Sequence, residues 1–128
     1  MTVGIASSLA NQILEIYRNV APTLVATPFI QLHTGDPGAA GTANVSVGST
    51  TRNAAVWNAA SGGSMTISSL GAWTNGGTSE TITHISIWTA SSAGTFKQSG
   101  ALTASQAWVS TNTLTLTTLT LAYSPIAA

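Results

Sequence analysis

The nine residues ETITHISIW, Glu80–Trp88, combine β-branched and aromatic side chains with no glycine or proline, a composition typical of a β-strand. Alternate residues of a strand point to opposite faces, so Ile85 and Ile87 share one face. Ile82 and Trp88 lie on the other face, and both faces therefore carry apolar side chains. This pattern predicts a central strand covered on both sides, by an opposite sheet and by either the N-terminal helix or another subunit.

Further runs of the same type lie on either side of this strand, separated by Gly-, Ser- and Asn-rich segments that favour tight turns. Six or more strands at this spacing are typical of an antiparallel sandwich or barrel. We therefore predict a mainly β fold, an antiparallel and jelly-roll-like β-sandwich preceded by one N-terminal α-helix. The predicted strands are PFIQLHT (28–34), RNAAVWN (52–58), SMTISSL (64–70), ETITHISIW (80–88), GTFKQSGAL (94–102) and NTLTLTTLTLAY (112–123).

The last predicted strand breaks its own alternation. Leu114 and Leu116 share one face under strict alternation, whereas Leu119 and Leu121 fall on the other. Either the strand crosses between two apolar environments, or one extra residue forms a bulge at Thr117–Thr118. We favour the bulge because it keeps all four leucines on one core.

The N-terminal residues have the periodicity of a helix. From Ile5 and Leu9 onward, apolar residues recur at intervals of three or four. Ser7 or Ser8 is suited to cap this helix, and Pro22 is suited to stop it. The helix can pack on the body of its own domain, or it can dock on a neighbouring subunit.

The change of periodicity near Pro28 divides the chain into two parts within one domain. We assign residues 1–27 to an N-terminal helix or arm and residues 28–128 to the sandwich. A chain of 128 residues is most simply a single domain with a core of its own.

The scarcity of charge favours a protein that is built into an assembly. Charged residues make up 5% of the chain, against about 25% in a typical soluble domain, and the net charge is zero. An unpaired buried charge is costly, whereas hydroxyl groups are buried readily with a local hydrogen-bond partner. Glu15 and Arg18 are three residues apart and can pair on the exposed side of the helix.

Several kinds of partner find no support in the sequence. A chain with no basic field does not attract nucleic acid, and no apolar run is long enough to span a bilayer. The absence of cysteine excludes disulfides, thiolate catalysis and cysteine-ligated metals. No phosphate-binding glycine motif and no basic signal-peptide region is present. We expect no nucleic-acid partner, no membrane partner and no cofactor.

The stretch LHTGDPG, residues 32–38, brings His33 close to Asp36 in sequence. A metal site usually needs three or four protein ligands, and the other imidazole in the chain is that of His84. A turn explains the stretch better, because Pro37 presets φ, Asp36 accepts a local N–H and Gly38 tolerates a left-handed conformation. We predict no metal site and, without a nucleophile elbow or a paired-carboxylate pattern, no catalytic residue.

Four tryptophans are many for a chain with so few charges. Trp57 and Trp88 are expected to anchor the core, while Trp73 and Trp108, beside loops, are expected at contacts between subunits. Exposed rings in a carbohydrate-binding module are the alternative, but the polar partners that fix sugar hydroxyls are sparse. Arg52 can pair with a carboxylate of its own chain or can reach a partner. The interface candidates are thus Trp73, Trp108, Arg52, Ile5 and Leu9.

Three segments resemble a family of small virion proteins of tailed bacteriophages. They are LHTGDPGAAGTANVS, TRNAAVWNAASGGS and, most specifically, THISIWTASSAGTFKQSGAL. The resemblance runs from Gln31 to about Ser105 and implies an N-terminal helix leading into a β-sandwich. It implies a virion structural protein, since members are described as minor capsid, decoration, tail or tail-fibre proteins, and it carries no catalytic residue.

These observations predict a non-enzymatic virion protein. Our first reading is a minor capsid or head decoration protein on the capsid exterior, made in the bacterial cytoplasm, a homo-oligomer and preferably a trimer that contacts the major capsid protein. The alternatives are a tail or tail-fibre component that contacts tail proteins, and a carbohydrate-binding module for host adhesion.

Overall fold

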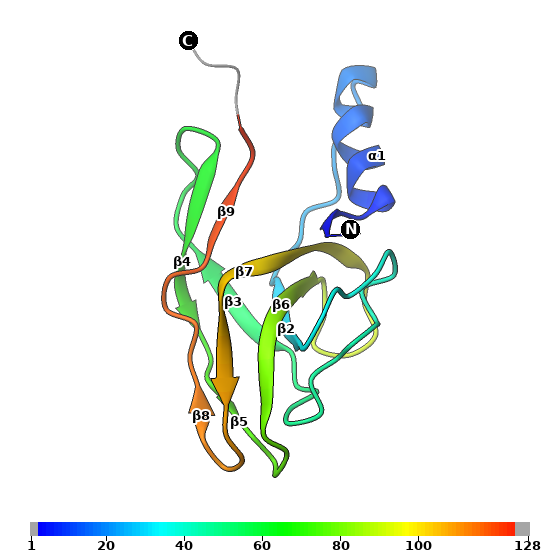
Figure 1. The fold of residues 1–128 in the computed structure, drawn as a ribbon. Helices are drawn as coiled ribbons and strands as arrows, with labels where there is room; N and C mark the ends of the chain where they lie inside the picture. The colour runs from blue at the N-terminus through cyan, green and yellow to red at the C-terminus, as the bar shows by residue number, and fades with distance from the viewer. Residues whose placement is uncertain (1–2, 125–128) are drawn as a thin grey trace.

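The computed structural model describes residues 3–124 and shows a mainly β protein with one short α-helix (Figure 1). The predicted fold class, mainly β with antiparallel strands after an N-terminal helix, is confirmed. The elements are β1 (Gly4–Ile5), α1 (Ser7–Glu15), the 3-10 helix η1 (Ile16–Arg18), β2 (Phe29–His33), β3 (Asn53–Trp57), β4 (Ser64–Leu70), β5 (Trp73–Thr74), β6 (Glu80–Trp88), β7 (Phe96–Trp108), β8 (Thr113–Leu114) and β9 (Thr120–Ala122).

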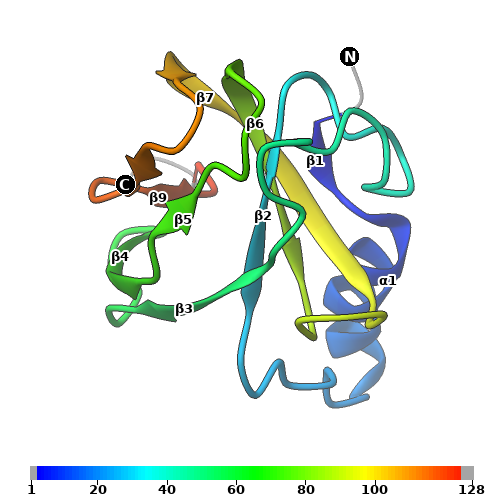
Figure 2. The same cartoon turned by 90° about the horizontal axis from the view of Figure 1, so that it is seen from below.

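Seven strands form one antiparallel sheet in the order β1-β7-β6-β2-β3-β4-β9, and β5 pairs with β8 in a second sheet. Strand β6 lies between β7 and β2, so its predicted central position is confirmed. The large sheet is strongly curled (Figure 2). Tyr123, just after the edge strand β9, donates its hydroxyl hydrogen to Gln98 Oε1 on β7, the neighbour of the other edge strand, β1.

One apolar core lies between the large sheet and the small sheet. Ile30 and Leu32 of β2 and Ile82 of β6 are fully buried in it. The small sheet contributes Trp73 and Leu114 to the same cluster. A two-stranded sheet is marginal alone, so burial of these side chains holds β5 and β8 against the large sheet.

The other face of β6 is covered by the loop between β2 and β3, which differs from both covers that the sequence suggested. On this face His33 bonds to Ala43 O of the loop at 2.8 Å. Gly41 lies so close to Phe96 that an added Cβ would meet the ring at 2.5 Å. The loop therefore closes this face within the subunit.

The last predicted strand is interrupted, so the bulge that we favoured there is wrong. Its first part, β8, pairs with β5, and its last part, β9, pairs with β4 in the large sheet. The segment between them is irregular, so the chain passes from the small sheet to the large sheet without leaving the one core. Leu114 still lies in the core, and the other three leucines pack against it: Leu116, Leu119 and Leu121.

Strand β7 contains a wide irregularity at its middle. Ile82 pairs with Gln106 and His84 pairs with Ala101, so the single residue Thr83 lies opposite residues 102–105. Strand β7 bends sharply along its length (Figure 1). Such extra residues increase local bending and leave part of the strand unpaired.

The helix starts and stops differently from the prediction. Its N-cap is Ala6, without a side-chain cap, so the prediction that Ser7 or Ser8 caps it is wrong because both lie inside the first turn. It ends before Pro22, at Asn19, which adopts a left-handed conformation with φ of 61°. Asparagine tolerates this conformation, which closes a helix well.

The turn predicted at LHTGDPG is confirmed. Asp36 Oδ1 accepts the Gly38 N–H at 2.9 Å, and Gly38 has a φ of 73°. The stretch is therefore the corner at which the chain leaves β2 and enters the covering loop.

Candidate docking surface

Polar contacts attach helix α1 to strand β7. Ser8 Oγ donates to Phe96 O at 3.5 Å, and Lys97 Nζ donates to Gln12 Oε1 at 3.2 Å. The Ala6 N–H also donates to Lys97 O, at 2.7 Å, at the start of the helix. Ser8 and Gln12 are four residues apart and share one helix face, on which Gln12 is half-buried and Ser8 stays exposed.

The apolar side chains of the helix are partly exposed, and Leu9 is half-buried. Leu9, Ile13 and Ile16 follow one another at intervals of four and three residues and share a second face. Ile13 is 39% exposed, Ile16 is 53% exposed, and no residue of α1 or η1 is buried. We call the exposed large apolar side chains of this region the arm surface: Ile5, Ile13, Leu14, Ile16, Tyr17, Val20 and Leu24.

A surface helix usually turns its apolar side chains toward the core, whereas Leu14, Ile16 and Tyr17 of this segment remain exposed. The helix stands beside the first part of β7, near the turn that joins β6 to β7 (Figures 1 and 2). Burial of exposed apolar surface is favourable by about 25 cal/mol per Å². A contiguous apolar patch on a folded chain marks an interaction site.

The arm surface carries no uncompensated charge from its own segment. Glu15 and Arg18 are the charged residues among residues 3–24, and their side chains form an ion pair at 2.7 Å. The predicted pairing of these two residues is confirmed. A partner of this surface therefore needs no complementary charge.

The five residues that the sequence offered for interfaces have different surroundings. Ile5 on β1 is 40% exposed and belongs to the arm surface, and Leu9 is half-buried in α1. Trp73 and Trp108 are only 1% and 2% exposed. Their burial does not fit the prediction that they face another subunit, because packing between the two sheets encloses both rings.

Both buried indoles also have hydrogen-bond partners inside the subunit. Trp73 Nε1 donates to Thr51 O at 2.9 Å, and Trp108 Nε1 donates to Asn112 O at 2.9 Å. Trp88, expected in the core, is buried as well. The sequence could not separate core from interface tryptophans because both environments favour the residue.

Arg52 contacts several parts of its own chain through its guanidinium group. Its guanidinium carbon lies 3.6 Å from the centre of the Trp88 ring, and Nη1 donates to Ala93 O at 2.6 Å. Nε donates to Gln31 Oε1 at 3.2 Å. Burial lowers the pKa of Arg52, which stays charged at any ordinary pH. The side chain thus ties the turn between β6 and β7 to β2.

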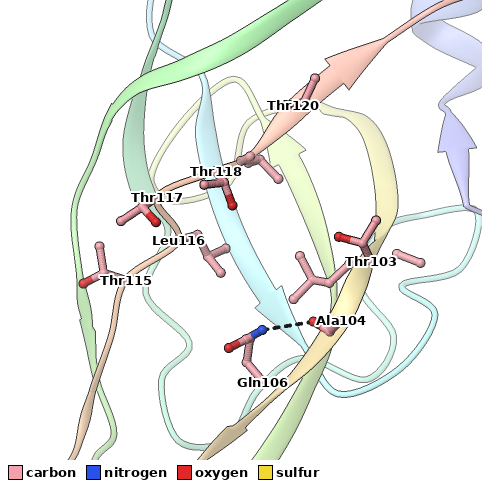
Figure 3. Close-up of a pocket in the computed structure, with 11 residues that line it drawn as sticks. Thr103, Ala104, Gln106, Thr115, Leu116, Thr117, Thr118 and Thr120 are labelled. Carbon is pink, nitrogen blue, oxygen red and sulfur yellow. Dashed lines mark hydrogen bonds between the residues drawn. The ribbon is translucent and has the colours of Figure 1, made fainter.

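A groove of about 430 Å³ lies between the irregular part of β7 and the segment that joins β8 to β9 (Figure 3). Threonines dominate its lining, together with Leu102, Leu116 and Leu119. Gln106 Nε2 donates to Ala104 O at 3.1 Å within it. No charged or titratable side chain lines this groove, so it offers no group for acid–base chemistry.

His33 and Ser86 form a hydrogen-bonded pair that resembles a nucleophile and its base. His33 Nδ1 lies 2.8 Å from Ala43 O, which requires a proton on that nitrogen, and Nε2 lies 2.7 Å from Ser86 Oγ. Ser86 Oγ also accepts from Trp88 Nε1 at 2.8 Å. Both His33 and Ser86 are 0% exposed, so the pair joins β2, β6 and the covering loop and is closed to a substrate.

The buried His33 predicts a loss of stability in acid. Burial lowers the pKa of His33 below 6.5. The hydrogen bond to Ala43 O opposes this shift, whereas the nearby His84 and Arg52 add to it. The unfolded chain therefore binds a proton more readily than the folded chain. We expect the free energy of unfolding to fall as the pH drops below about 6.5, measured by denaturant titration between pH 7.5 and pH 5. The His33→Asn variant should be less stable but should show a flatter pH profile, and an unchanged profile would contradict this assignment.

Glu80, the first residue of β6, is held by hydrogen bonds from the loop between β2 and β3. Its carboxylate accepts from Ser46 Oγ, from the Val47 N–H at 3.2 Å and from the Gly48 N–H at 3.0 Å.

Within residues 3–124, no three His, Cys, Asp or Glu residues cluster as a metal site would require. No helix in the same range has the length and apolar character to cross a bilayer.

Comparison with known proteins gives one family. The model of the family described as podophage GP4 fiber I protein gp80 matches residues 4–124. No curated protein matches the chain. The family match supports the predicted kinship with phage virion proteins and spans the arm, both sheets and the groove. The chain therefore belongs to the podophage GP4 fiber I protein gp80 family.

Proposed function

We propose that this protein is a non-enzymatic structural component of the fibre apparatus of a podophage virion, anchored there through the arm surface. The observation that carries the proposal is the set of large apolar side chains that the N-terminal arm leaves in solvent, among them Ile16, Tyr17 and Leu24 at 53%, 89% and 87% exposure. A chain with 5% charged residues and an exposed apolar arm is suited to permanent contact with other virion proteins.

The family description moves our preference from the head to the fibre. A head decoration protein was the first reading of the sequence, with the tail or fibre as its alternative. Tail and fibre proteins and further copies of the chain are the partners in this proposal, and the virion is its location. A carbohydrate-binding role is not adopted because three of the four rings that could stack on sugars are buried: Trp73, Trp88 and Trp108.

Immunogold labelling of purified particles tests the location. A phage is built whose copy of this protein carries a short epitope in the exposed turn at Gly62, where nothing lies within 4 Å of an added side chain. We expect gold particles on the fibres and none on the capsid shell. Label on the shell would support head decoration, and unlabelled particles with tagged protein in the lysate would exclude a virion role.

A further inference from the structure

We infer that the groove between β7 and the segment 115–119 receives residues 23–27 of another copy of this chain as an added strand. Residues 21–28, which lie between η1 and β2, are called the linker here. The inference rests on the proposed function in that it names a partner for part of the arm surface, since Leu24 belongs to that surface. It goes further by assigning an acceptor site on the β body.

The groove lies between two pieces of backbone that lack strand partners. Within residues 3–124, β1 pairs with β7 at Gln98 and Ser99 alone, so the outer edge of β7 is open from Gly100 onward. Residues 102–105 have no paired residue in β6 either. Across the groove, no backbone hydrogen bond in the same part of the chain involves residues 115–118. Open edges of this kind bind an extended peptide through its main chain.

Strand β1 already uses the same edge of β7. A hollow of about 70 Å³ continues the groove toward β1, and both spaces are lined by Ala101, Leu119 and Thr120. Gln98 and Ser99, the partners of β1, line the far end of that hollow. The edge therefore accepts an added strand in this fold, and residues 101–106 offer about 20 Å more of it.

The chemistry of the groove favours an uncharged peptide over other ligands. Among the described residues that line it, none is charged and none is aromatic, so an ion would lose its hydration without a partner and a sugar would find no ring to stack on. The half-buried leucines of the lining, Leu102 and Leu116 among them, pack against the core and leave part of their surface open. An occupant with an apolar face would bury that surface.

The linker is a segment with this chemistry. Residues 19–35 carry no charge, and Leu24 is 87% exposed. Within residues 3–124, no backbone–backbone hydrogen bond includes residues 21–27. Pro22 and Pro28 disfavour a helical conformation in the residue before each of them, and Thr, Val and Leu between them suit a strand. Leu24 and Ala26 share one face of that strand and would meet the leucines of the groove.

The linker reaches the groove of another copy and not its own. It runs beside α1, on the other side of the molecule from the chain that joins β8 to β9 (Figures 1 and 2). Its end is fixed at Phe29, which pairs with Ala54 and Trp88. One chain thus carries both an unfilled acceptor and an unpaired, uncharged segment that matches it, which favours a second copy as the partner. Such head-to-tail contacts close into a ring or extend into a filament.

A capped peptide of linker sequence, acetyl-APTLVATP-amide, tests the acceptor site. The receptor is the full-length Leu24→Asp variant, whose own linker no longer competes for the groove. We expect the peptide to slow hydrogen exchange of backbone amides in residues 101–106 and 115–119 about 10-fold, measured by mass spectrometry. The same peptide with aspartate in place of leucine should give no protection. Residues 58–63, outside the groove, should exchange equally in all samples.

Sedimentation equilibrium of the full chain tests the contact between copies. Leu24→Asp would bury a charge in an uncharged groove, so we expect its Kd for self-association to rise about 100-fold. Val56→Asp is the matched control, because Val56 on β3 is 56% exposed and lies outside both the linker and the groove. This variant should form the same oligomer as the wild type. Circular dichroism verifies that both variants are folded.

Cysteine cross-linking tests the pairing of linker with groove, because the natural chain has no cysteine. Chains with Leu24→Cys, mixed with chains that carry Thr117→Cys in the groove wall, should form disulfides between the two kinds of chain under mild oxidation. The exposed Thr42 lies outside the groove, and Thr42→Cys should give little of this product.

Groove amides that the peptide leaves unchanged, or a wild type that is monomeric at about 100 μM, would overturn the inference. Equal dissociation of Leu24→Asp and Val56→Asp would overturn it as well, since added charge alone would then be the cause. Gold label on the fibres leaves the proposed function intact in each of these cases. Label on the capsid shell would remove the fibre assignment even if the linker binds the groove, so the two failures are distinguishable.

Discussion

Replacing Trp73 by alanine is expected to lower the free energy of unfolding by about 3–5 kcal/mol, the range for removal of a buried aromatic side chain. Trp73 is 1% exposed and belongs to the cluster that joins the small sheet to Ile30 and Leu32. The substitution also removes the indole N–H that donates a hydrogen bond to Thr51 O. Domains of this size are stable by about 5–15 kcal/mol, so much of the margin would be lost.

Guanidinium chloride unfolding followed by circular dichroism measures this effect. The control is Val56→Ala on β3, which removes a side chain that is 56% exposed, and we expect a change within about 0.5 kcal/mol. The experiment also separates the two roles considered for Trp73. Wild-type stability combined with a lost oligomer would mean that the ring serves an interface and not the core.

The second large effect is expected at Gly41. This residue has a φ of 72°, and a Cβ there would lie 2.5 Å from Cδ2 of the Phe96 ring. The left-handed conformation costs an alanine about 1–2 kcal/mol, and overpacking a tight site costs about 1–3 kcal/mol. We expect Gly41→Ala to destabilise the fold by about 2–5 kcal/mol, because Phe96 is held between the loop and Trp88.

Gly62→Ala separates the cost of the left-handed conformation from the cost of the clash with Phe96. Gly62 has a φ of 58° with nothing within 4 Å of an added Cβ, so it carries the conformational cost without the clash. We expect a loss of about 1–2 kcal/mol for Gly62→Ala in the same unfolding measurement. Equal losses for the two variants would show that the covering loop moves away from Phe96 at little cost.

The local pattern of the sequence predicted the strands that alternate regularly. The predicted runs at 64–70 and 80–88 coincide with β4 and β6, because a period of two residues is a property of the strand itself. The corner at Asp36 and the Glu15–Arg18 pair were predicted for the same reason, since each depends on residues two or three apart. Short strands without a pattern, β1 and β5, were missed.

The candidate docking surface was predicted in part. Helical spacing identified an amphipathic N-terminal helix and placed Ile5 and Leu9 among the interface candidates. Whether the helix turned its apolar face toward its own body could not be predicted, because a periodic pattern states which residues share a face and not what that face meets. Trp73 and Trp108 were predicted at interfaces because the sequence likewise does not state what surrounds a tryptophan side chain.

The amino-acid sequence was sufficient to predict antiparallel strands after one helix, a chain with almost no charge, and corners at glycine-rich segments. Three features were set by tertiary packing: loop 34–50 closes the outer face of β6, the last predicted strand divides between two sheets, and α1 attaches to β7. Each of these depends on contacts between residues distant in sequence, such as Ala43 with His33, Leu119 with Ile67 and Gln12 with Lys97. Local periodicity specifies the conformation of a segment, whereas its partners are selected by the free energy of the whole packed chain.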